Sequence, residues 1–99
     1  MGAAGRSQYA ATKAALLGLA RSCALELAYR GITVNVIAPG ATETPMLHDP
    51  ARRGNPPKLP PIGRFIQPRE IAELAAYLLS PFGAAITGQQ ITICGGSSL

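Results

Sequence analysis

The amino-acid sequence contains no tryptophan, and aromatic residues make up only 5% of the chain. Proteins that bind single-stranded nucleic acids stack bases on aromatic side chains and collect basic residues on one surface. Here the nine lysines and arginines are scattered along the sequence, although the formal net charge is +4. We therefore expect no nucleic-acid partner.

Long apolar runs are also absent. No stretch approaches the roughly 18 to 20 apolar residues that cross a bilayer, and the first residues include Arg6 but no apolar signal region. We therefore expect a cytoplasmic protein that does not enter a membrane. With 99 residues, of which 47% are hydrophobic, the chain forms at most one small globular domain.

Metal-ligand patterns are a third absence. Cys23 and Cys94 have neither the C-x-x-C spacing nor the histidine partner of a zinc site. We expect two buried thiols and no metal. His48 is the only histidine, and its proline-rich surroundings favour a solvated side chain over a catalytic one.

The first half of the chain contains a helix followed at once by a strand. Alanine and leucine recur at helical spacing from about residue 8 to residue 30, with Ser7 placed to cap the start and Gly31 placed to end the helix. Residues 32–38 are short, β-branched and almost continuously apolar. Such a run is typical of a strand buried on both faces of a parallel sheet.

The second half contains a long loop, a second helix and a second strand. Residues 39–40 end the first strand, and residues 41–67 form a proline-rich loop. This loop begins at the C-terminal end of the strand, the edge of the sheet at which open α/β folds bind ligands. Pro68 suits the first turn of a helix, and residues 90–94 have the pattern of a strand, ended by residues 95–96. Helix, strand, loop, helix and strand in this order predict an α/β fold with a parallel sheet.

One polar pair lies on the first predicted helix. Tyr9 and Lys13 are four residues apart, so their side chains project from the same helical face. A tyrosine with its ordinary pKa of about 10 is a poor acid or base at neutral pH, and a neighbouring ammonium lowers that pKa by favouring the phenolate. Such a pair is most often an ordinary surface pair, so its significance depends on the motifs that follow it.

The motifs form an ordered set, although each is weak alone. In chain order they are Tyr9-x-x-x-Lys13, Gly31-Ile32-Thr33-Val34-Asn35, Pro39-Gly40-x-x-x-Thr44-Pro45-Met46, Ile86-Thr87-Gly88-Gln89 and Gly95-Gly96. Together they resemble the C-terminal part of the short-chain dehydrogenase/reductase family. The resemblance implies that residues 1–99 are the C-terminal portion of one Rossmann-type domain with a doubly wound parallel sheet. It also implies that residues 45–67 form the substrate loop.

The resemblance implies an NAD(P)-dependent oxidoreductase that transfers a hydride between a nicotinamide and a carbonyl compound or secondary alcohol. Tyr9 would be the general acid/base that exchanges a proton with the substrate oxygen, and it would also belong to the cofactor-binding residues together with Lys13. Lys13 would bond the hydroxyls of the nicotinamide ribose and lower the pKa of the tyrosine.

The same resemblance gives the turn after the first strand a role in cofactor binding. Pro39, Gly40 and Thr42 would lie against the nicotinamide through their backbones, and Thr44 would reach its amide or the diphosphate. Thr42 stands where family members often have an aliphatic residue, a mild departure if only the main chain acts there. Cys94 stands where many members have aspartate, and no function follows for it.

The family's diphosphate-binding turn and its substrate-holding serine are not found among these residues. Gly2-Ala3-Ala4-Gly5 lacks the spacing and the preceding strand of the turn that binds the dinucleotide diphosphate. Ser7 is too close to Tyr9 to be the family's substrate-holding serine. We therefore interpret the chain as a fragment, without the N-terminal dinucleotide-binding half, that is unstable and inactive by itself. The intact protein is expected to be a homodimer or homotetramer.

The substrate and the choice between NAD and NADP stay open. A small carbonyl compound or alcohol is implied, and the basic residues of the loop are compatible with an acyl-carrier-bound substrate. Two other interpretations of the chain also stay open. One is a non-catalytic dimerisation or interaction module formed by the alanine-rich helix, and the other is a structural remnant of the family.

Overall fold

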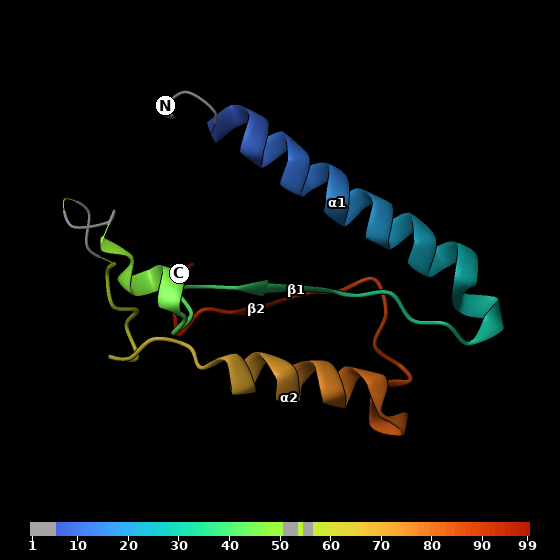
Figure 1. Ribbon diagram of the computed structural model, residues 1–99. Coiled ribbons are helices and arrows are strands. Elements are labelled where there is room, and N and C mark those ends of the chain that lie inside the picture. Colours follow the sequence, from blue (N-terminus) through green and yellow to red (C-terminus); the bar gives the residue numbers. More distant parts are fainter. Residues whose placement is uncertain (1–5, 51–53, 55–56) are drawn as a thin grey trace. The chain divides into compact units, whose positions relative to one another are not determined.

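The computed structural model of the protein describes residues 6–50, 54 and 57–99 (Figure 1). Helices and strands follow one another in the order expected from the sequence, and the α/β prediction is confirmed. The described residues form two compact units, one within residues 1–36 and 84–90 and the other within residues 37–83 and 91–99. The elements are helix α1 (Arg6–Leu27), 3-10 turn η1 (Ala28–Arg30), strand β1 (Val36–Pro39), 3-10 turn η2 (Pro45–His48), helix α2 (Pro68–Leu79), 3-10 turn η4 (Pro81–Gly83) and strand β2 (Gln90–Ile93).

Helix α1 differs from its predicted bounds at both ends. It already includes Arg6, so Ser7 lies inside the first turn and the predicted serine cap is wrong. A serine caps a helix from the non-helical position before the first turn, and Ser7 is itself already helical. At the other end the chain tightens into η1, and Gly31 stops it as predicted, with a φ of 73° and an N–H that donates to the Ala28 carbonyl at 2.9 Å.

Small side chains determine how the first unit packs. Ala20 and Ala24 are the buried residues of α1. Gly88 lies in the turn before β2, and a Cβ added to it would stand 3.6 Å from the Ala24 Cβ. The turn therefore runs directly against the helix, which the alanine-rich face permits.

Strands β1 and β2 pair in parallel. The Val36 N–H donates to the Gln89 carbonyl at 2.8 Å, and the Gly40 N–H donates to the Ile93 carbonyl at 2.9 Å. Both strands therefore advance in the same direction, as the parallel sheet predicted from the sequence requires.

The first strand begins later than predicted, at Val36 instead of Ile32. Residues 34–35 are joined to the turn before β2 by hydrogen bonds that involve side chains. The Val34 N–H donates to Thr87 Oγ1 at 3.1 Å, and Asn35 donates Nδ2–H to the Ile86 carbonyl at 2.9 Å. Asn35 Oδ1 also accepts the N–H of Gln89. Asn35 therefore satisfies backbone groups of the turn before β2.

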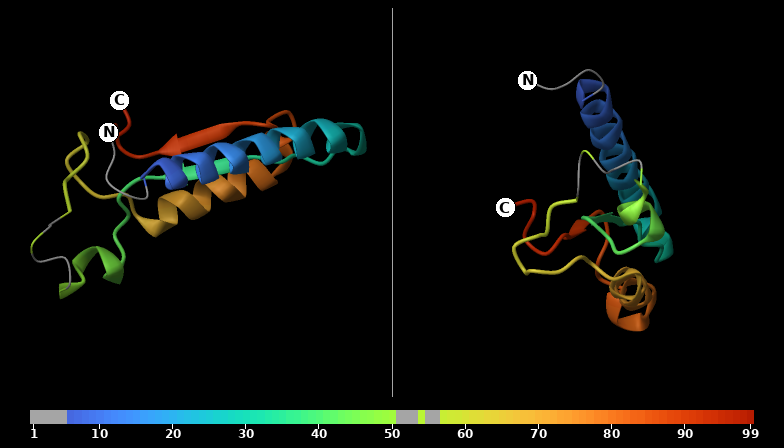
Figure 2. Two further views of the ribbon diagram at one scale, coloured as in Figure 1. Left: turned by 90° about the horizontal axis from the view of Figure 1, so that it is seen from above. Right: turned by 60° about the vertical axis from the view of Figure 1, so that its left-hand side comes forward.

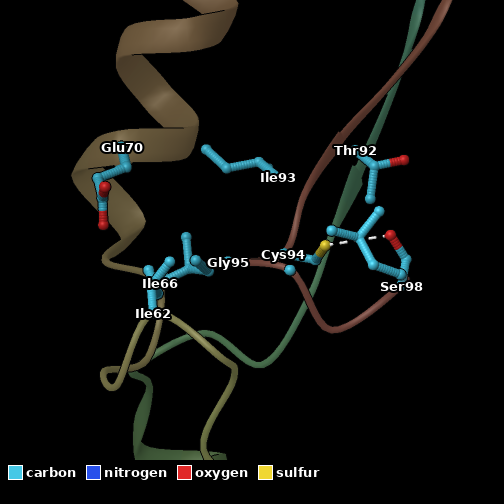
Figure 3. Close-up of a pocket in the computed structure, with 10 residues that line it drawn as sticks. Ile62, Ile66, Glu70, Thr92, Ile93, Cys94, Gly95 and Ser98 are labelled. Atoms are coloured by element: carbon cyan, nitrogen blue, oxygen red, sulfur yellow. Dashed lines mark hydrogen bonds between the residues drawn. The ribbon is translucent and has the colours of Figure 1, made fainter.

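Helix α2 begins at Pro68, as expected, and lies alongside the paired strands (Figures 1 and 2). The Ile93 side chain points from β2 toward this helix (Figure 3). Among the described residues of the second unit, the hydrophobic core includes Ala38, Leu47, Ile66 and Leu78. Ile66 is the most buried of them, with 2% of its surface exposed.

Residues 6–50, 54 and 57–99 contain neither a membrane-spanning helix nor a metal-binding cluster. No helix in this part of the chain is long and apolar enough to cross a membrane. No cluster of three or more histidine, cysteine, aspartate or glutamate side chains suitable for a metal ion occurs there either.

Candidate active site

Tyr9 and Lys13 lie on one face of α1 in the first unit. The Lys13 Nζ stands 5.7 Å from the centroid of the Tyr9 ring, within the range of a cation–π contact. The Tyr9 side chain is 65% exposed, and Lys13 is exposed beside it. The helical spacing has therefore produced an accessible phenol with an ammonium directly next to it.

The segment from Pro39 to Thr44 lies in the second unit and begins where β1 ends. A Cβ added to Gly40 would stand 2.9 Å from both Cα and Cβ of Cys94. Only glycine fits this close approach of two backbones. The Thr42 hydroxyl donates to the Gly40 carbonyl at 2.9 Å and so fixes the turn from inside.

The other side of this segment pairs with the chain just before α2. Thr42 and Ile66 form a parallel bridge. The Ile66 N–H donates to the Ala41 carbonyl at 3.0 Å, and the Ile66 carbonyl accepts the Glu43 N–H at 2.7 Å. Sequence reasoning missed Ile66, because a backbone bridge of one residue leaves no periodic signal.

Thr44 is the N-cap of η2 and has an extended backbone, with φ −136° and ψ 163°. Its carbonyl accepts the Leu47 N–H at 3.0 Å. Among the described residues its hydroxyl makes no capping hydrogen bond. A half-buried hydroxyl thus stays available for another partner.

His48, for which a solvated side chain was expected, is exposed at the end of η2. Its Nε2 is hydrogen-bonded to the Glu43 carboxylate. Its ring meets the edge of Phe65 at 6.5 Å between centroids and an interplanar angle of 82°. This contact connects the start of the loop, at His48, with its end, at Phe65.

The cysteines are free thiols, as expected, but both are half-buried instead of buried. Cys94 lines a cavity of about 480 Å³ with an apolar wall that includes Ile62, Ile66 and Ile93 (Figure 3). Its Sγ lies 3.3 Å from the Ser98 hydroxyl. Hydrogen bonding to the Ser98 side chain and then to its backbone lowers the pKa of the Cys94 thiol.

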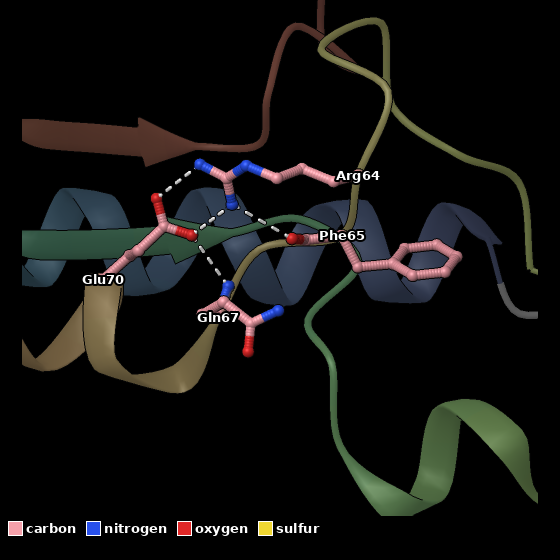
Figure 4. Close-up of polar contacts among 4 residues, drawn as sticks. All are labelled: Arg64, Phe65, Gln67 and Glu70. Atoms are coloured by element: carbon pink, nitrogen blue, oxygen red, sulfur yellow. Dashed lines mark hydrogen bonds and ion pairs between the residues drawn. The ribbon is translucent and has the colours of Figure 1, made fainter.

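An ion pair closes the loop onto the start of α2 (Figure 4). The Arg64 guanidinium donates to both Glu70 oxygens, at 2.6 and 3.0 Å. The Gln67 N–H donates to the same carboxylate at 2.9 Å. The Arg64 hydrogen bond, followed by that of the Gln67 backbone, lowers the pKa of Glu70 to about 2. The carboxylate therefore stays ionised at any pH near neutrality.

The expected site residues thus fall into two groups. Tyr9 and Lys13 are together in the first unit, and Pro39, Gly40, Thr42 and Thr44 are together in the second. The segment Gly2-Ala3-Ala4-Gly5, considered for the diphosphate turn, lies outside the described residues. The catalytic and cofactor-binding roles of the two groups of residues stay predictions at this point.

Comparison with known proteins gives the chain its family. The family model described as enoyl-(acyl carrier protein) reductase matches residues 1–98. The chain belongs to the short-chain dehydrogenase/reductase family. The resemblance drawn from the motifs is therefore confirmed.

Individual relatives agree with this family. The chain is 46% identical over 99 residues to the 3-oxoacyl-(acyl-carrier-protein) reductase FabG of Vibrio cholerae, covering 97% of this chain and 40% of that protein. A Brucella melitensis 3-oxoacyl-(acyl-carrier protein) reductase with bound NAD has a TM-score of 0.75 at 38% identity, covering 92% of this chain and 33% of that one.

A blue fluorescent protein from a metagenomic library, in complex with NADPH, has a TM-score of 0.81 at 37% identity, covering 99% of this chain and 40% of that one. These neighbours support the assignment to part of a Rossmann-type fold. The chain spans about two fifths of the length of the curated relatives it matches.

Proposed function

We propose that this chain supplies the proton-transfer pair and part of the nicotinamide site of an NAD(P)-dependent oxidoreductase. The enzyme would transfer a hydride between the nicotinamide and a carbonyl compound or secondary alcohol. The observation that carries the proposal is the approach of the Lys13 ammonium to 5.7 Å from the Tyr9 ring centroid on an exposed face of α1. A phenol in this setting is accessible to a substrate oxygen with which it can exchange a proton.

The two side chains have separate tasks in this proposal. In the reducing direction Tyr9 Oη gives its proton to the oxygen of the former carbonyl, and in the oxidising direction it takes a proton from the alcohol. The Lys13 ammonium carries three donors, which suit the hydroxyls of the nicotinamide ribose. The bound nicotinamide supplies or accepts the hydride.

The turn after β1 has the properties of a surface for the nicotinamide. Pro39 has no N–H, Gly40 has no side chain, and the Thr42 hydroxyl is occupied within its own turn, so these residues present mainly backbone. Thr44 keeps a hydroxyl that caps nothing among the described residues. In the proposal this hydroxyl bonds the nicotinamide amide or the diphosphate.

A 3-oxoacyl thioester is the first substrate to test, because the Vibrio cholerae relative is named a 3-oxoacyl-(acyl-carrier-protein) reductase. Basic residues of the loop offer contacts to an acidic carrier. Of these, Lys58 is exposed, Arg64 is already paired with Glu70, and Arg52 and Arg53 lie outside the described residues. We further propose that the complete protein works in the cytoplasm as a homodimer or homotetramer.

The chain alone is proposed to lack activity, because no turn for the dinucleotide diphosphate is found in its sequence. The test therefore uses a full-length form in which the part of the Vibrio cholerae reductase that this chain does not match, about three fifths of its length, is joined ahead of residues 1–99. We expect this form to consume NADH or NADPH with a 3-oxoacyl thioester, and the chain alone to consume neither.

The decisive variant of the full-length form is Tyr9→Phe. Removal of a general acid/base lowers turnover by roughly 10²- to 10⁴-fold, while the fluorescence titration of the reduced cofactor should stay unchanged. Tyr29→Phe is the matched control, since Tyr29 is 86% exposed beyond the end of α1. Turnover of the Tyr9→Phe variant near that of the control would refute the proposed role.

A second candidate function rests on the apolar exposure of α1. Leu16, Leu19 and Leu25 are 53%, 62% and 82% exposed, a pattern that also suits pairing of the helix with a second copy of itself. Sedimentation and cofactor titration of the full-length form separate the two candidates. Self-association without cofactor binding would favour a non-catalytic interaction module.

A further inference from the structure

We propose that Arg64, Ile66, Gln67 and Glu70 form a brace that positions residues 41–43 for cofactor binding. None of these four side chains is required to touch the cofactor. The inference rests on the proposed function, since it takes residues 39–44 as the surface for the nicotinamide. It adds that the affinity of this surface depends on an ion pair at the start of α2.

The brace acts on the turn through two backbone hydrogen bonds. Ile66 donates to the Ala41 carbonyl at 3.0 Å and accepts from the Glu43 N–H at 2.7 Å, so it holds the residues on both sides of Thr42. Ile66 is only 2% exposed. Its buried side chain prevents the backbone at this point from moving independently of the core.

The position of Ile66 is itself determined by one carboxylate. Glu70 Oε1 accepts both from Arg64 Nη1 at 2.6 Å and from the Gln67 N–H at 2.9 Å, and Glu70 Oε2 accepts from Arg64 Nη2 at 3.0 Å. Figure 4 shows the chain bending around this carboxylate. Because Ile66 lies between Arg64 and Gln67 in sequence, fixing these two neighbours fixes it as well.

The opposite side of the turn is held by β2. The Gly40 N–H donates to the Ile93 carbonyl at 2.9 Å, and the Gly40 Cα is in close approach to Cys94. The turn is therefore held between the end of β2 and Ile66. A surface fixed in this way before binding does not have to be ordered by the ligand, which improves affinity.

The test compares two arginines of the full-length form. Arg64→Met removes the ion pair, whereas Arg69→Met removes an exposed charge in the first turn of α2 that lies outside the brace. If the turn then holds its binding shape for about a tenth of the time, the apparent Kd of the reduced cofactor rises about tenfold. At saturating cofactor, kcat should stay within about twofold of the parent value.

Two further variants refine the outcome. Arg64→Lys keeps the charge but loses the bidentate geometry, so we expect an intermediate cofactor Kd. Glu70→Gln keeps an oxygen for the Gln67 N–H but loses the charge, and its Kd should also rise. A merely structural role of the ion pair would lower the melting temperature of these variants without changing Kd or the ratio of KM to kcat.

Hydrogen exchange separates a failure of the brace from a failure of the proposed function. In the parent protein the amides of Glu43 and Ile66 should exchange slowly, and in Arg64→Met but not Arg69→Met they should exchange faster. This readout needs no activity. The brace is overturned if Arg64→Met leaves both the exchange of these amides and the cofactor Kd unchanged. An inactive but folded parent with slow exchange at both amides would instead refute the oxidoreductase and leave the brace as a structural finding.

Discussion

The two groups of site residues are built in opposite ways. Tyr9 and Lys13 project from an exposed face of α1, whereas the turn from Gly40 to Glu43 is held by hydrogen bonds from two sides. Side chains that exchange protons with a substrate need to be accessible. A segment that acts through its backbone needs a fixed conformation, and this requires partners elsewhere in the chain.

Among the variants, Ile66→Ala is expected to lower stability most, because Ile66 holds the turn from Gly40 to Glu43. Deleting a fully buried isoleucine side chain to alanine costs about 2–5 kcal/mol. Urea unfolding of the full-length form measures this loss. Leu79→Ala is the control, because Leu79 is 87% exposed on α2 and its replacement should change stability by at most about 0.5 kcal/mol. Equal losses in the two variants would contradict the account of Ile66.

Lys13→Met tests the cofactor-binding role of the exposed pair formed by Tyr9 and Lys13. Loss of hydrogen bonds from a charged donor typically costs about 1.5–3 kcal/mol, so we expect kcat/KM for the cofactor to fall roughly 10- to 100-fold. The unfolding midpoint in urea should hardly move, because Lys13 is exposed. Arg21→Met, at another exposed position of α1, is the control. An equal fall in kcat/KM for this control would show that only the net charge matters.

Gly40, in the turn after β1, and Gly18, in α1, differ in the space around them. Gly40→Ala places a Cβ 2.9 Å from Cys94, and such overpacking costs about 1–3 kcal/mol. Gly18 in α1 has nothing within 4 Å of its added Cβ, so Gly18→Ala should instead stabilise the protein by up to about 1 kcal/mol. Thermal melts of the two variants should therefore shift in opposite directions, and shifts in the same direction would count against the account.

The smallest effect is expected in acid. The pKa of Glu70 is lowered from its ordinary value of 4.5 to about 2, so its ion pair stabilises the folded state fully above about pH 4.5. This contribution is lost as the pH falls from 4.5 through 2. The stability of Glu70→Gln should therefore fall less steeply in this range than that of the parent. Parallel pH profiles of urea unfolding would contradict the assignment.

The sequence was a good guide where a local rule decides the structure. Pro68 marked the start of α2, and the four-residue interval placed Tyr9 and Lys13 on one face. The family itself followed from the order of several weak motifs, and the comparisons confirm it.

The sequence was a poor guide where distant partners decide. The start of β1 depends on side-chain bonds between Asn35 and residues 86 and 89, some fifty positions away. Ile66 had no helical or strand pattern around it, and the carboxylate shared by Arg64 and Gln67 depends on the bend of the chain. Patterns along the chain carry no information on such contacts, because hydrophobic periodicity reports only on regular elements.

In the proposed function Tyr9 moves the proton while the turn after β1 holds the cofactor. Single-turnover hydride transfer by the full-length form and its Tyr9→Phe variant, at saturating reduced cofactor, tests it most directly. The account predicts equal cofactor Kd values and a transfer rate at least about a hundredfold lower in the variant. A variant that transfers hydride within about threefold of the parent rate, well below the loss expected of a general acid, would contradict it.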